Sequence, residues 1–264
     1  MPSILDSFRL DGQVAIVTGS GRGIGAATAL AYADAGADVV ISSRTVSQCE
    51  ETAEQVRARG RRALVVPCDV LEPDQRANLV DAALAEYGRL DVLVNNAGGW
   101  PPKPTLHTSE KEFDACFQFN VTTAFAMTRL AVPKIAETAG KGAVVNISSV
   151  AGRWHSAGFA AYGTAKAALS FLTRQLAQDF APKVRVNAIA VGSVRTDALG
   201  TILNDQVEKI MVDMTPLARL GEVEDIAACA LYLASPAASF VTGEIYGVNG
   251  GLTAINFPMP RAEI

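Results

Sequence analysis

The chain has 264 residues, of which 49% are hydrophobic and 19% are charged, so it holds enough apolar side chains for a substantial core and too little charge to be disordered. Its 23 basic and 27 acidic residues give a formal net charge of −4, without the basic excess that a protein needs to neutralise many phosphates. These values exclude a disordered chain, and we expect no nucleic-acid partner.

We expect the protein to lie in the cytoplasm. No apolar run of the sequence approaches the roughly 18 to 20 residues that a membrane-spanning helix needs, so no membrane contact is expected. Asp6, Arg9 and Asp11 interrupt the first segment, which therefore does not resemble a secretory signal. The four cysteines have no paired spacing, as is usual in a reducing compartment. The two histidines, His107 and His155, are too far apart in the sequence to indicate a metal site.

Short apolar runs alternate with longer alanine-rich segments along the whole chain. The short runs are rich in β-branched residues and predict strands, whereas the length and periodicity of the longer segments predict helices. Strands that alternate with helices indicate an α/β fold with a parallel sheet covered by helices on both faces. The predicted strands are 14–18, 39–42, 63–66, 92–95, 143–147, 184–189 and 244–248, and the predicted helices include 25–35, 46–59, 75–87 and 164–180.

No repeat, low-complexity block or charged linker divides the chain, so we predict a single domain that spans residues 1–264. Two segments break the regular alternation: 98–108, which contains three prolines, and 192–221, which follows the sixth predicted strand. Loops at the carboxyl ends of parallel strands line the ligand site, so both segments are predicted to form walls of a substrate pocket. Residues 192–221 are the predicted substrate lid.

The first predicted strand runs directly into a glycine-rich turn, residues 18–25, with the sequence TGSGRGIG. Glycine permits a tight turn and the close approach of a pyrophosphate, whose charge is favoured by the free amides and the positive dipole at the start of a helix. The spacing departs from a strict G-x-G-x-x-G pattern, but the strand, turn and helix follow one another as in dinucleotide-binding folds. The turn therefore predicts a nucleotide site.

The end of the second predicted strand indicates which nicotinamide cofactor is bound. NAD-binding folds usually place an Asp or Glu there on the ribose 2′-hydroxyl, but residues 42–45 read SSRT and contain no carboxylate. Arg44, together with Arg22 of the glycine turn, can instead bind a 2′-phosphate through charge-assisted hydrogen bonds. We therefore predict a preference for NADP(H), with NAD(H) as the alternative.

Tyr162 and Lys166 are four residues apart, so on a helix they lie on one face, one turn apart. A nearby positive charge favours phenolate and lowers a tyrosine pKa from its usual value of ~10 by about 1 to 3 units. Ser149, at the end of the preceding strand, brings a hydroxyl to the carboxyl edge of the sheet. These three side chains form a predicted proton-transfer site.

Together these motifs resemble the short-chain dehydrogenase/reductase family, and the resemblance covers nearly the whole chain. It includes the triplet Cys-Asp-Val at 68–70, Asn-Asn-Ala-Gly at 95–98 and Val-Asn-Gly-Gly at 248–251, all in the family's order. The resemblance implies a seven-stranded, doubly wound Rossmann-type domain. It also implies an enzyme that transfers a hydride between a nicotinamide cofactor and a secondary alcohol or ketone.

The resemblance also implies a role for each residue of a catalytic tetrad. Tyr162 would be the general acid/base and Ser149 would hydrogen-bond the substrate oxygen. Lys166 would lower the pKa of Tyr162 and hold the nicotinamide ribose. Asn120, which lies between Phe119 and Val121, matches the family position that supports a proton-relay water.

The same resemblance assigns residues to the cofactor. Val191 and Asn249 depart from the family pattern, which commonly has Pro and Asp at these positions, so no contact of that Asp is carried over to this chain. Asp69 and Val70 would hold the adenine, and Val194 and Thr196 the nicotinamide carboxamide. The full set of predicted cofactor residues is Gly19, Ser20, Arg22, Gly23, Ile24, Gly25, Ser43, Arg44, Asp69, Val70, Asn96, Ala97, Gly98, Tyr162, Lys166, Gly192, Val194 and Thr196.

Within the family, the chain resembles bacterial 7α-hydroxysteroid dehydrogenases in particular, for example over residues 95–104, 196–199 and 235–239. The predicted lid is rich in apolar residues, which include Ile202. Such a lining predicts an apolar, ring-bearing substrate such as a hydroxysteroid, although the same residues can simply pack the lid onto the domain. The predicted substrate contacts are Trp100, Trp154, His155, Phe159, Leu199 and Leu203.

Two other functions stay open at this point. The first is a 3-oxoacyl thioester (acyl-carrier-protein) reductase, which is disfavoured because no Lys/Arg cluster beyond Arg195 and Arg219 is evident near the lid to receive a phosphopantetheine carrier. The second is a non-catalytic NADPH-binding regulator, which the complete tetrad disfavours. The family resemblance further implies a homotetramer that packs through the helices ending near Pro133 and Phe180.

Overall fold

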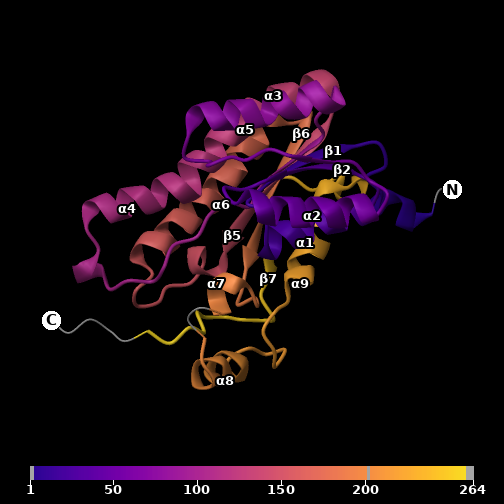
Figure 1. The fold of residues 1–264 in the computed structure, drawn as a ribbon. Coiled ribbons are helices and arrows are strands. Elements are labelled where there is room, and N and C mark those ends of the chain that lie inside the picture. Colours follow the sequence, from indigo (N-terminus) through magenta and orange to yellow (C-terminus); the bar gives the residue numbers. More distant parts are fainter. Residues whose placement is uncertain (1–2, 201–202, 260–264) are drawn as a thin grey trace.

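Seven parallel strands form one sheet in the order β3-β2-β1-β4-β5-β6-β7, with helices on both faces (Figure 1). This computed structural model describes residues 3–200 and 203–259. The doubly wound parallel sheet confirms the predicted Rossmann-type α/β fold. The strands are β1 (Val14–Thr18), β2 (Asp38–Ser42), β3 (Ala63–Val65), β4 (Val92–Asn95), β5 (Gly142–Ser149), β6 (Val184–Val191) and β7 (Ile245–Val248).

Two groups of helices cover the sheet. α1, α2 and α9 pack on one face and α3, α5 and α6 on the other, while α4 lies against α6 (Figure 1). Within the described ranges, no helix has the length and apolar character needed to cross a membrane. The helices are α1 (Gly23–Asp34), α2 (Val46–Ala58), α3 (Pro73–Tyr87), α4 (Glu110–Phe117), α5 (Thr123–Thr138), α6 (Ala160–Phe180), α7 (Asp197–Gly200), α8 (Asp205–Asp213) and α9 (Val223–Ala234).

β5 and β6 each extend two residues beyond the ends predicted at 147 and 189. Ser148 and Ser149 are polar, so the sequence pattern marks them as the start of a loop. In the structure they stay in the sheet, because Ser148 pairs with Ala190 and Ser149 with Val191 of β6. This extension places the Ser149 hydroxyl at the carboxyl edge of the sheet, where the ligands of such folds bind.

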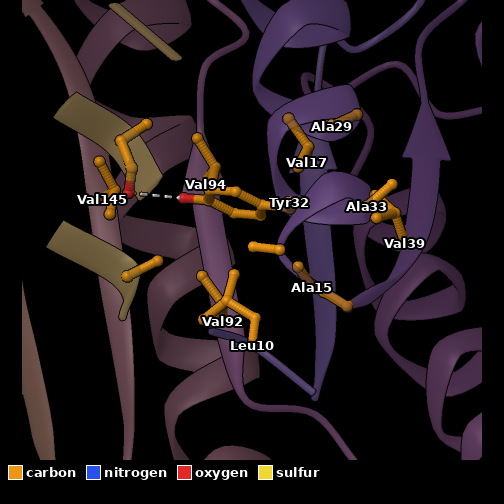
Figure 2. Close-up of a cluster of buried hydrophobic side chains, with 14 of the residues drawn as sticks. Leu10, Ala15, Val17, Ala29, Tyr32, Ala33, Val39, Val92, Val94 and Val145 are labelled. Atoms are coloured by element: carbon orange, nitrogen blue, oxygen red, sulfur yellow. Dashed lines mark hydrogen bonds between the residues drawn. The ribbon is translucent and has the colours of Figure 1, made fainter. Parts of the chain in front are cut away.

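Tyr32 joins α1 to α9 inside the core (Figure 2). Its side chain is fully buried, and its phenol donates a hydrogen bond to the Ala230 carbonyl of α9 at 3.1 Å. The hydroxyl is therefore satisfied away from water, and burial raises the pKa of Tyr32. Ala29 and Ala33 on the same helix are small and buried, which lets α1 approach the strands closely (Figure 2). This packing holds the C-terminal half of α1 against α9 and the sheet.

Candidate active site

The glycine turn between β1 and α1 is tied to the end of β4. Gly19 and Gly23 have φ angles of 65° and 57°, which glycine adopts without strain. Asn96 Nδ2 donates to the carbonyl oxygens of Thr18 and Gly19 at 2.9 and 3.0 Å. A Cβ on Gly25 would lie 2.5 Å from Asn96 Nδ2, so only glycine fits at this position of α1, beside the Asn96 side chain. The turn is thus a tight cradle at the N-terminus of α1, which suits a pyrophosphate.

A cavity of about 420 Å³ opens along the carboxyl edge of the sheet. Its lining comes from the loops after β1 to β6 and from α6, as expected for the ligand site of a doubly wound fold. The lining residues are Gly19, Gly21, Arg22, Gly23, Ile24, Ser43, Arg44, Thr45, Gln48, Cys68, Asp69, Val70, Asn96, Ala97, Gly98, Gly99, Phe119, Ile147, Ser148, Ser149, Tyr162, Lys166, Val191, Gly192, Thr196 and Asp197.

Arg22 and Arg44, the predicted phosphate ligands, both line this cavity with largely exposed side chains. Arg22 Nη1 lies 3.6 Å from a carboxylate oxygen of Asp197, and Arg44 Nη1 lies 3.9 Å from a carboxylate oxygen of Asp69. Exposed ion pairs whose charged atoms lie this far apart contribute little to the free energy of folding. Each guanidinium group can therefore leave its carboxylate for a phosphate at low cost.

Ser149 and Tyr162 meet at the same edge. Both side chains line the same cavity, and the Ser149 hydroxyl lowers the pKa of the Tyr162 phenol. Ser149 ends β5 and Tyr162 lies in the first turn of α6. The two elements approach because Gly163 has no side chain: a Cβ there would lie 2.8 Å from the carbonyl oxygen of Ala151, in the turn after β5. The structure therefore brings together two of the predicted catalytic residues.

Lys166 lies one turn after Tyr162 on α6 and is only 4% exposed. Its Nζ donates to the Ile147 carbonyl of β5 at 2.8 Å and lies 5.7 Å from the centre of the Tyr162 ring. Its backbone carbonyl accepts from the hydroxyls of Ser148 and Ser170 at 3.0 and 2.9 Å. The bond to Ile147 holds the ammonium group at the cavity, and the two bonds to the backbone carbonyl fix this part of α6.

Asn120 lies in a π-helical turn, Gln118–Thr122, between α4 and α5, and π-turns are frequent at functional sites. Its Oδ1 accepts from the Gly99 amide at 2.8 Å, and its Nδ2 donates to the Gly99 carbonyl at 3.1 Å. A Cβ on Gly98 would lie 2.9 Å from Asn120 Oδ1 and 3.2 Å from Lys166 Nζ, so the three groups converge. Asn120 is buried below the cavity lining and positions the loop after β4.

Burial dominates the electrostatics of the Tyr162 and Lys166 pair. It raises the pKa of Tyr162 to about 12, although the nearby Ser149 hydroxyl opposes the rise. It also lowers the pKa of Lys166 to about 8. The family resemblance implies that the lysine lowers the pKa of the tyrosine, whereas here the cost of burying a phenolate is larger. Further positive charge beside the phenol is needed to make a phenolate at neutral pH.

Comparison with known proteins identifies the family. A sequence profile described as enoyl-(acyl carrier protein) reductase matches residues 19–253. An uncharacterized oxidoreductase from Mycobacterium tuberculosis is 54% identical, over 99% of this chain and 100% of the relative. The 7α-hydroxysteroid dehydrogenase of Escherichia coli is 39% identical, over 93% of this chain and 96% of the relative. The chain belongs to the short-chain dehydrogenase/reductase family.

Solved structures of the family agree with this fold. A 7α-hydroxysteroid dehydrogenase complexed with NADH and 7-oxo glycochenodeoxycholic acid has a TM-score of 0.91 and 38% identity, covering 95% of this chain and 98% of that one. A gluconate 5-dehydrogenase from Burkholderia cenocepacia in complex with NADP and tartrate has a TM-score of 0.89 and 32% identity, covering 95% and 99%. The protein is thus an oxidoreductase of alcohols and ketones that uses a nicotinamide cofactor.

Most predicted cofactor residues of this short-chain dehydrogenase/reductase line the cavity, but three do not. The Ser20 hydroxyl is fully buried and accepts from the Ser42 amide at 2.8 Å, so it joins β1 to β2. Gly25 serves the packing of α1 against Asn96. Val194 is buried and lines a separate cavity of about 140 Å³ near α9. These residues shape the turns rather than the surface of the cavity.

None of the six predicted substrate residues, all of which the structure describes, lines the cofactor cavity. Phe159 comes nearest, because its ring centre lies 6.5 Å from that of Tyr162. Trp100 packs on the apolar cluster that also supports Tyr162, Trp154 is half-buried and His155 is exposed. Phe159 and Trp100 therefore lie on the Tyr162 side of the site without lining the cofactor cavity.

The lid residues lie further along the chain. Leu199 and Leu203 are half-buried, and the Leu203 amide donates to the Leu199 carbonyl at 3.1 Å. Ile202 lies outside the described residues. Val191, where the family commonly has Pro, continues β6 and pairs with Val248 of β7, so it lengthens the strand.

Several cavity residues were not predicted. Phe119 and Asp197 are sequence neighbours of predicted residues, whereas Gln48 lies in the first turn of α2 and no motif marks it. Only the return of α2 toward the glycine turn brings Gln48 to the cavity: a Cβ on Gly21 would lie 3.0 Å from Gln48 Cβ. The other unpredicted lining residues are Gly21, Thr45, Cys68, Gly99, Ile147, Ser148 and Val191.

Proposed function

We propose that the protein is an NADP(H)-dependent oxidoreductase that interconverts a secondary alcohol and a ketone, with an apolar, ring-bearing substrate such as a hydroxysteroid. One observation carries the proposal: a single cavity is lined by Ser149, Tyr162 and Lys166 and also by Arg22 and Arg44. A proton-transfer group and phosphate-binding groups therefore face one ligand. The glycine cradle at the start of α1 fits the pyrophosphate of a dinucleotide.

The chain's own residues would handle the proton while the bound nicotinamide supplies or accepts the hydride. Tyr162 would give a proton to the ketone oxygen, or take it from the alcohol. The Ser149 hydroxyl, which lines the same cavity as the phenol, would donate to the same oxygen and stabilise charge that develops on it. Lys166 would provide positive charge beside the phenol, and Asn120 would hold the loop that contacts the lysine.

The NADP(H) preference is supported by the residues after β2. Ser43, Arg44 and Thr45 line the cavity and none is acidic, whereas Arg22 reaches it from the glycine turn. Isothermal titration with NADP⁺ and NAD⁺ tests this preference. Binding of NAD⁺ at least as tight as that of NADP⁺ would overturn it.

The hydroxysteroid assignment is supported by the similarity to 7α-hydroxysteroid dehydrogenases and by the aromatic ring of Phe159 next to Tyr162. A 3-oxoacyl thioester reductase is disfavoured, because the cations of the lid are paired with carboxylates. Arg195 bonds to Glu208, Lys209 Nζ lies 2.8 Å from Asp213, and Arg219 Nη1 lies 2.7 Å from Asp225. Each would have to leave its carboxylate to receive the phosphate of a phosphopantetheine carrier.

The initial rate of NADPH formation tests the function directly. Purified protein is given NADP⁺ and a panel of hydroxysteroids that includes 7α-hydroxy bile acids, with NAD⁺ in parallel. A fast, position-selective signal with NADP⁺ is expected. If no hydroxysteroid reacts, the substrate proposal fails, and oxoacyl thioesters and small ketones are assayed in the reductive direction.

We also propose a homotetramer. Four phenylalanines on α4, α5 and α6 expose between 36% and 59% of their surface, which leaves an apolar patch for a second copy of the chain. Light scattering that gives a monomer of 27.7 kDa at micromolar concentration would contradict this assembly. The phenylalanines are Phe113, Phe117, Phe125 and Phe171.

Residues 1–264 are proposed as one domain with a lid at 192–221, which carries α7 and α8. Residues 1–2, 201–202 and 260–264 of this span lie outside the described part of the chain. A cytoplasmic location is proposed as well, supported by four cysteines that are all free thiols. Localisation of a tagged chain by microscopy tests that proposal.

A further inference from the structure

The C-terminal segment after β7 is fixed to the lid by Asn256, which is 2% exposed. Asn256 Nδ2 donates to the Met211 carbonyl of α8 at 3.0 Å and to Thr215 Oγ1 at 3.1 Å. Its Oδ1 accepts from the Ser193 hydroxyl at 2.6 Å. Ser193 directly follows Gly192, which lines the cofactor cavity. One buried amide therefore joins three segments: the tail, the lid helix and the loop after β6.

The residues after Asn256 reach the catalytic tyrosine through stacked rings. Phe257 packs edge-on against Phe159 with ring centres 6.4 Å apart, and Phe159 lies 6.5 Å from the Tyr162 ring. A Cβ on Gly158 would lie 2.7 Å from the Met259 methyl group, so the tail also touches the loop before α6. Phe257 is half-buried and keeps part of its ring free for a ligand.

The tail, the lid and the loop before α6 are thus parts of one wall beside Tyr162. Figure 1 shows the C-terminal segment running alongside α8, on the side of the sheet where its carboxyl edge lies. The contacts of this wall are apolar near Phe257 and polar only at Asn256, whose amide is fully bonded. An apolar substrate that spans several rings would extend from Tyr162 to this wall, whereas a small alcohol would not.

We propose that Asn256 is a positioning residue that ties α8 and the tail to the loop after β6, and that Phe257, held by it, sets a preference for multi-ring over small alcohols. The proposal rests on the proposed function, because it takes Tyr162 as the group that contacts the substrate oxygen. Loss of the amide removes the partner of the Ser193 hydroxyl and leaves Thr215 Oγ1 and the Met211 carbonyl bonded only to each other, at 2.7 Å, so nothing polar ties the tail to them.

The test compares Asn256→Ala, Phe257→Ala and Ser193→Ala with the parent protein. KM and kcat are measured with NADP⁺ for a 7α-hydroxy bile acid and for 2-butanol. For Asn256→Ala and Phe257→Ala, KM for the bile acid is expected to rise about tenfold or more, the effect typical of a lost apolar contact in a pocket. KM for 2-butanol and the Kd of NADP⁺ are expected to stay within about twofold.

Phe240→Ala is the matched control, because Phe240 is fully exposed and precedes β7, whereas the tail follows that strand. Ser193→Ala removes one hydrogen bond of the Asn256 side-chain amide. When Ser193→Ala and Asn256→Ala are combined in one protein, the fold-rise in KM is therefore expected to be less than the product of the two single fold-rises. Hydrogen exchange of the α8 amides is measured in parallel. Exchange faster than in the parent protein is expected for Asn256→Ala and not for Phe240→Ala.

Equal changes in KM for both alcohols would overturn the role of Phe257 in specificity. Unchanged exchange of α8 in Asn256→Ala would overturn the positioning role. A parent protein that oxidises neither alcohol would instead contradict the proposed function, and the exchange measurement would then decide the role of Asn256 by itself.

Discussion

Lys166 Nζ lies 5.7 Å from the centre of the Tyr162 ring, one helical turn along α6. The same burial raises the pKa of the phenol to about 12 and lowers that of the ammonium group to about 8. Both side chains are therefore biased toward their neutral forms. A phenolate is favoured only when positive charge stands beside it, and Lys166 is the chain's own source of that charge.

Replacement of Tyr162 by Phe is expected to remove turnover while NADP⁺ binding is kept. The substitution deletes only the hydroxyl, and general acid/base catalysis typically contributes about 10² to 10⁴ to the rate. Steady-state kcat and the Kd of NADP⁺ are measured for Tyr162→Phe and for Tyr87→Phe, a control on α3 that does not line the cavity. A Tyr162→Phe protein with the parent kcat would sink the assigned role of the phenol.

The depressed pKa of Lys166 predicts how stability changes with pH. Burial lowers this pKa from 10.5 to about 8, so between these values the unfolded chain binds more protons than the folded chain. The contribution of this lysine to the free energy of unfolding therefore rises with pH across that window and is least favourable below it. Relative to Lys166→Met, the parent is expected to gain about 2 kcal/mol between about pH 7.5 and pH 9.5.

Urea denaturation of the two proteins at both ends of that window measures the gain. Lys183→Met, at an exposed position before β6, is the control and is expected to follow the parent. The comparison uses the difference between proteins because burial also raises the pKa of Cys68 and Cys229 to about 11, which affects all three proteins alike. A difference between parent and Lys166→Met that does not change with pH would contradict the buried-lysine account.

The positions of the strands along the chain and the site motifs were predictable because each has a local signal. The apolar run at 14–18 and the glycines after it mark β1 and its turn, and the Tyr162 and Lys166 spacing marks one helix face. The ends of β5 were not predictable, because Ser148 and Ser149 join the sheet only by pairing with β6, which is a contact between distant segments.

The substrate side shows the same limit. Phe159 was predicted as an aromatic residue of the substrate lining, but Asn256 and Phe257 were not, since no motif marks the tail as part of a wall. The hydrogen bonds of the Asn256 amide form only when α8 and the loop after β6 come together around it. The carboxylate partner of Arg44 likewise comes from the loop after β3, far away in the sequence.

Replacement of Arg44 by Ala is expected to reduce NADP⁺ affinity selectively. A hydrogen bond to a charged group contributes about 1.5 to 3 kcal/mol, so the Kd of NADP⁺ should rise about tenfold to hundredfold while that of NAD⁺ changes little. Arg57→Ala is the control, since Arg57 lies on α2 and pairs with Glu50 away from the cavity. Titration calorimetry measures the ratio of the Kd of NADP⁺ to the Kd of NAD⁺. If Arg44→Ala leaves this ratio unchanged, Arg44 does not bind the 2′-phosphate.

Replacement of Gly25 by Ala is expected to distort the glycine turn between β1 and α1, the proposed nucleotide cradle. The new Cβ would lie 2.5 Å from Asn96 Nδ2 and would also collide with the Gly19 carbonyl, so either α1 or the turn must move. Such overpacking costs about 1 to 3 kcal/mol of stability, and movement of the turn should also weaken binding of both NADP⁺ and NAD⁺. Gly200→Ala is the matched control, because no atom of the described residues lies within 4 Å of a Cβ there. Urea denaturation and calorimetry measure both effects, and a Gly25→Ala protein as stable as the control, with parent affinity for both cofactors, would show that the close contact of α1 with the turn is not required.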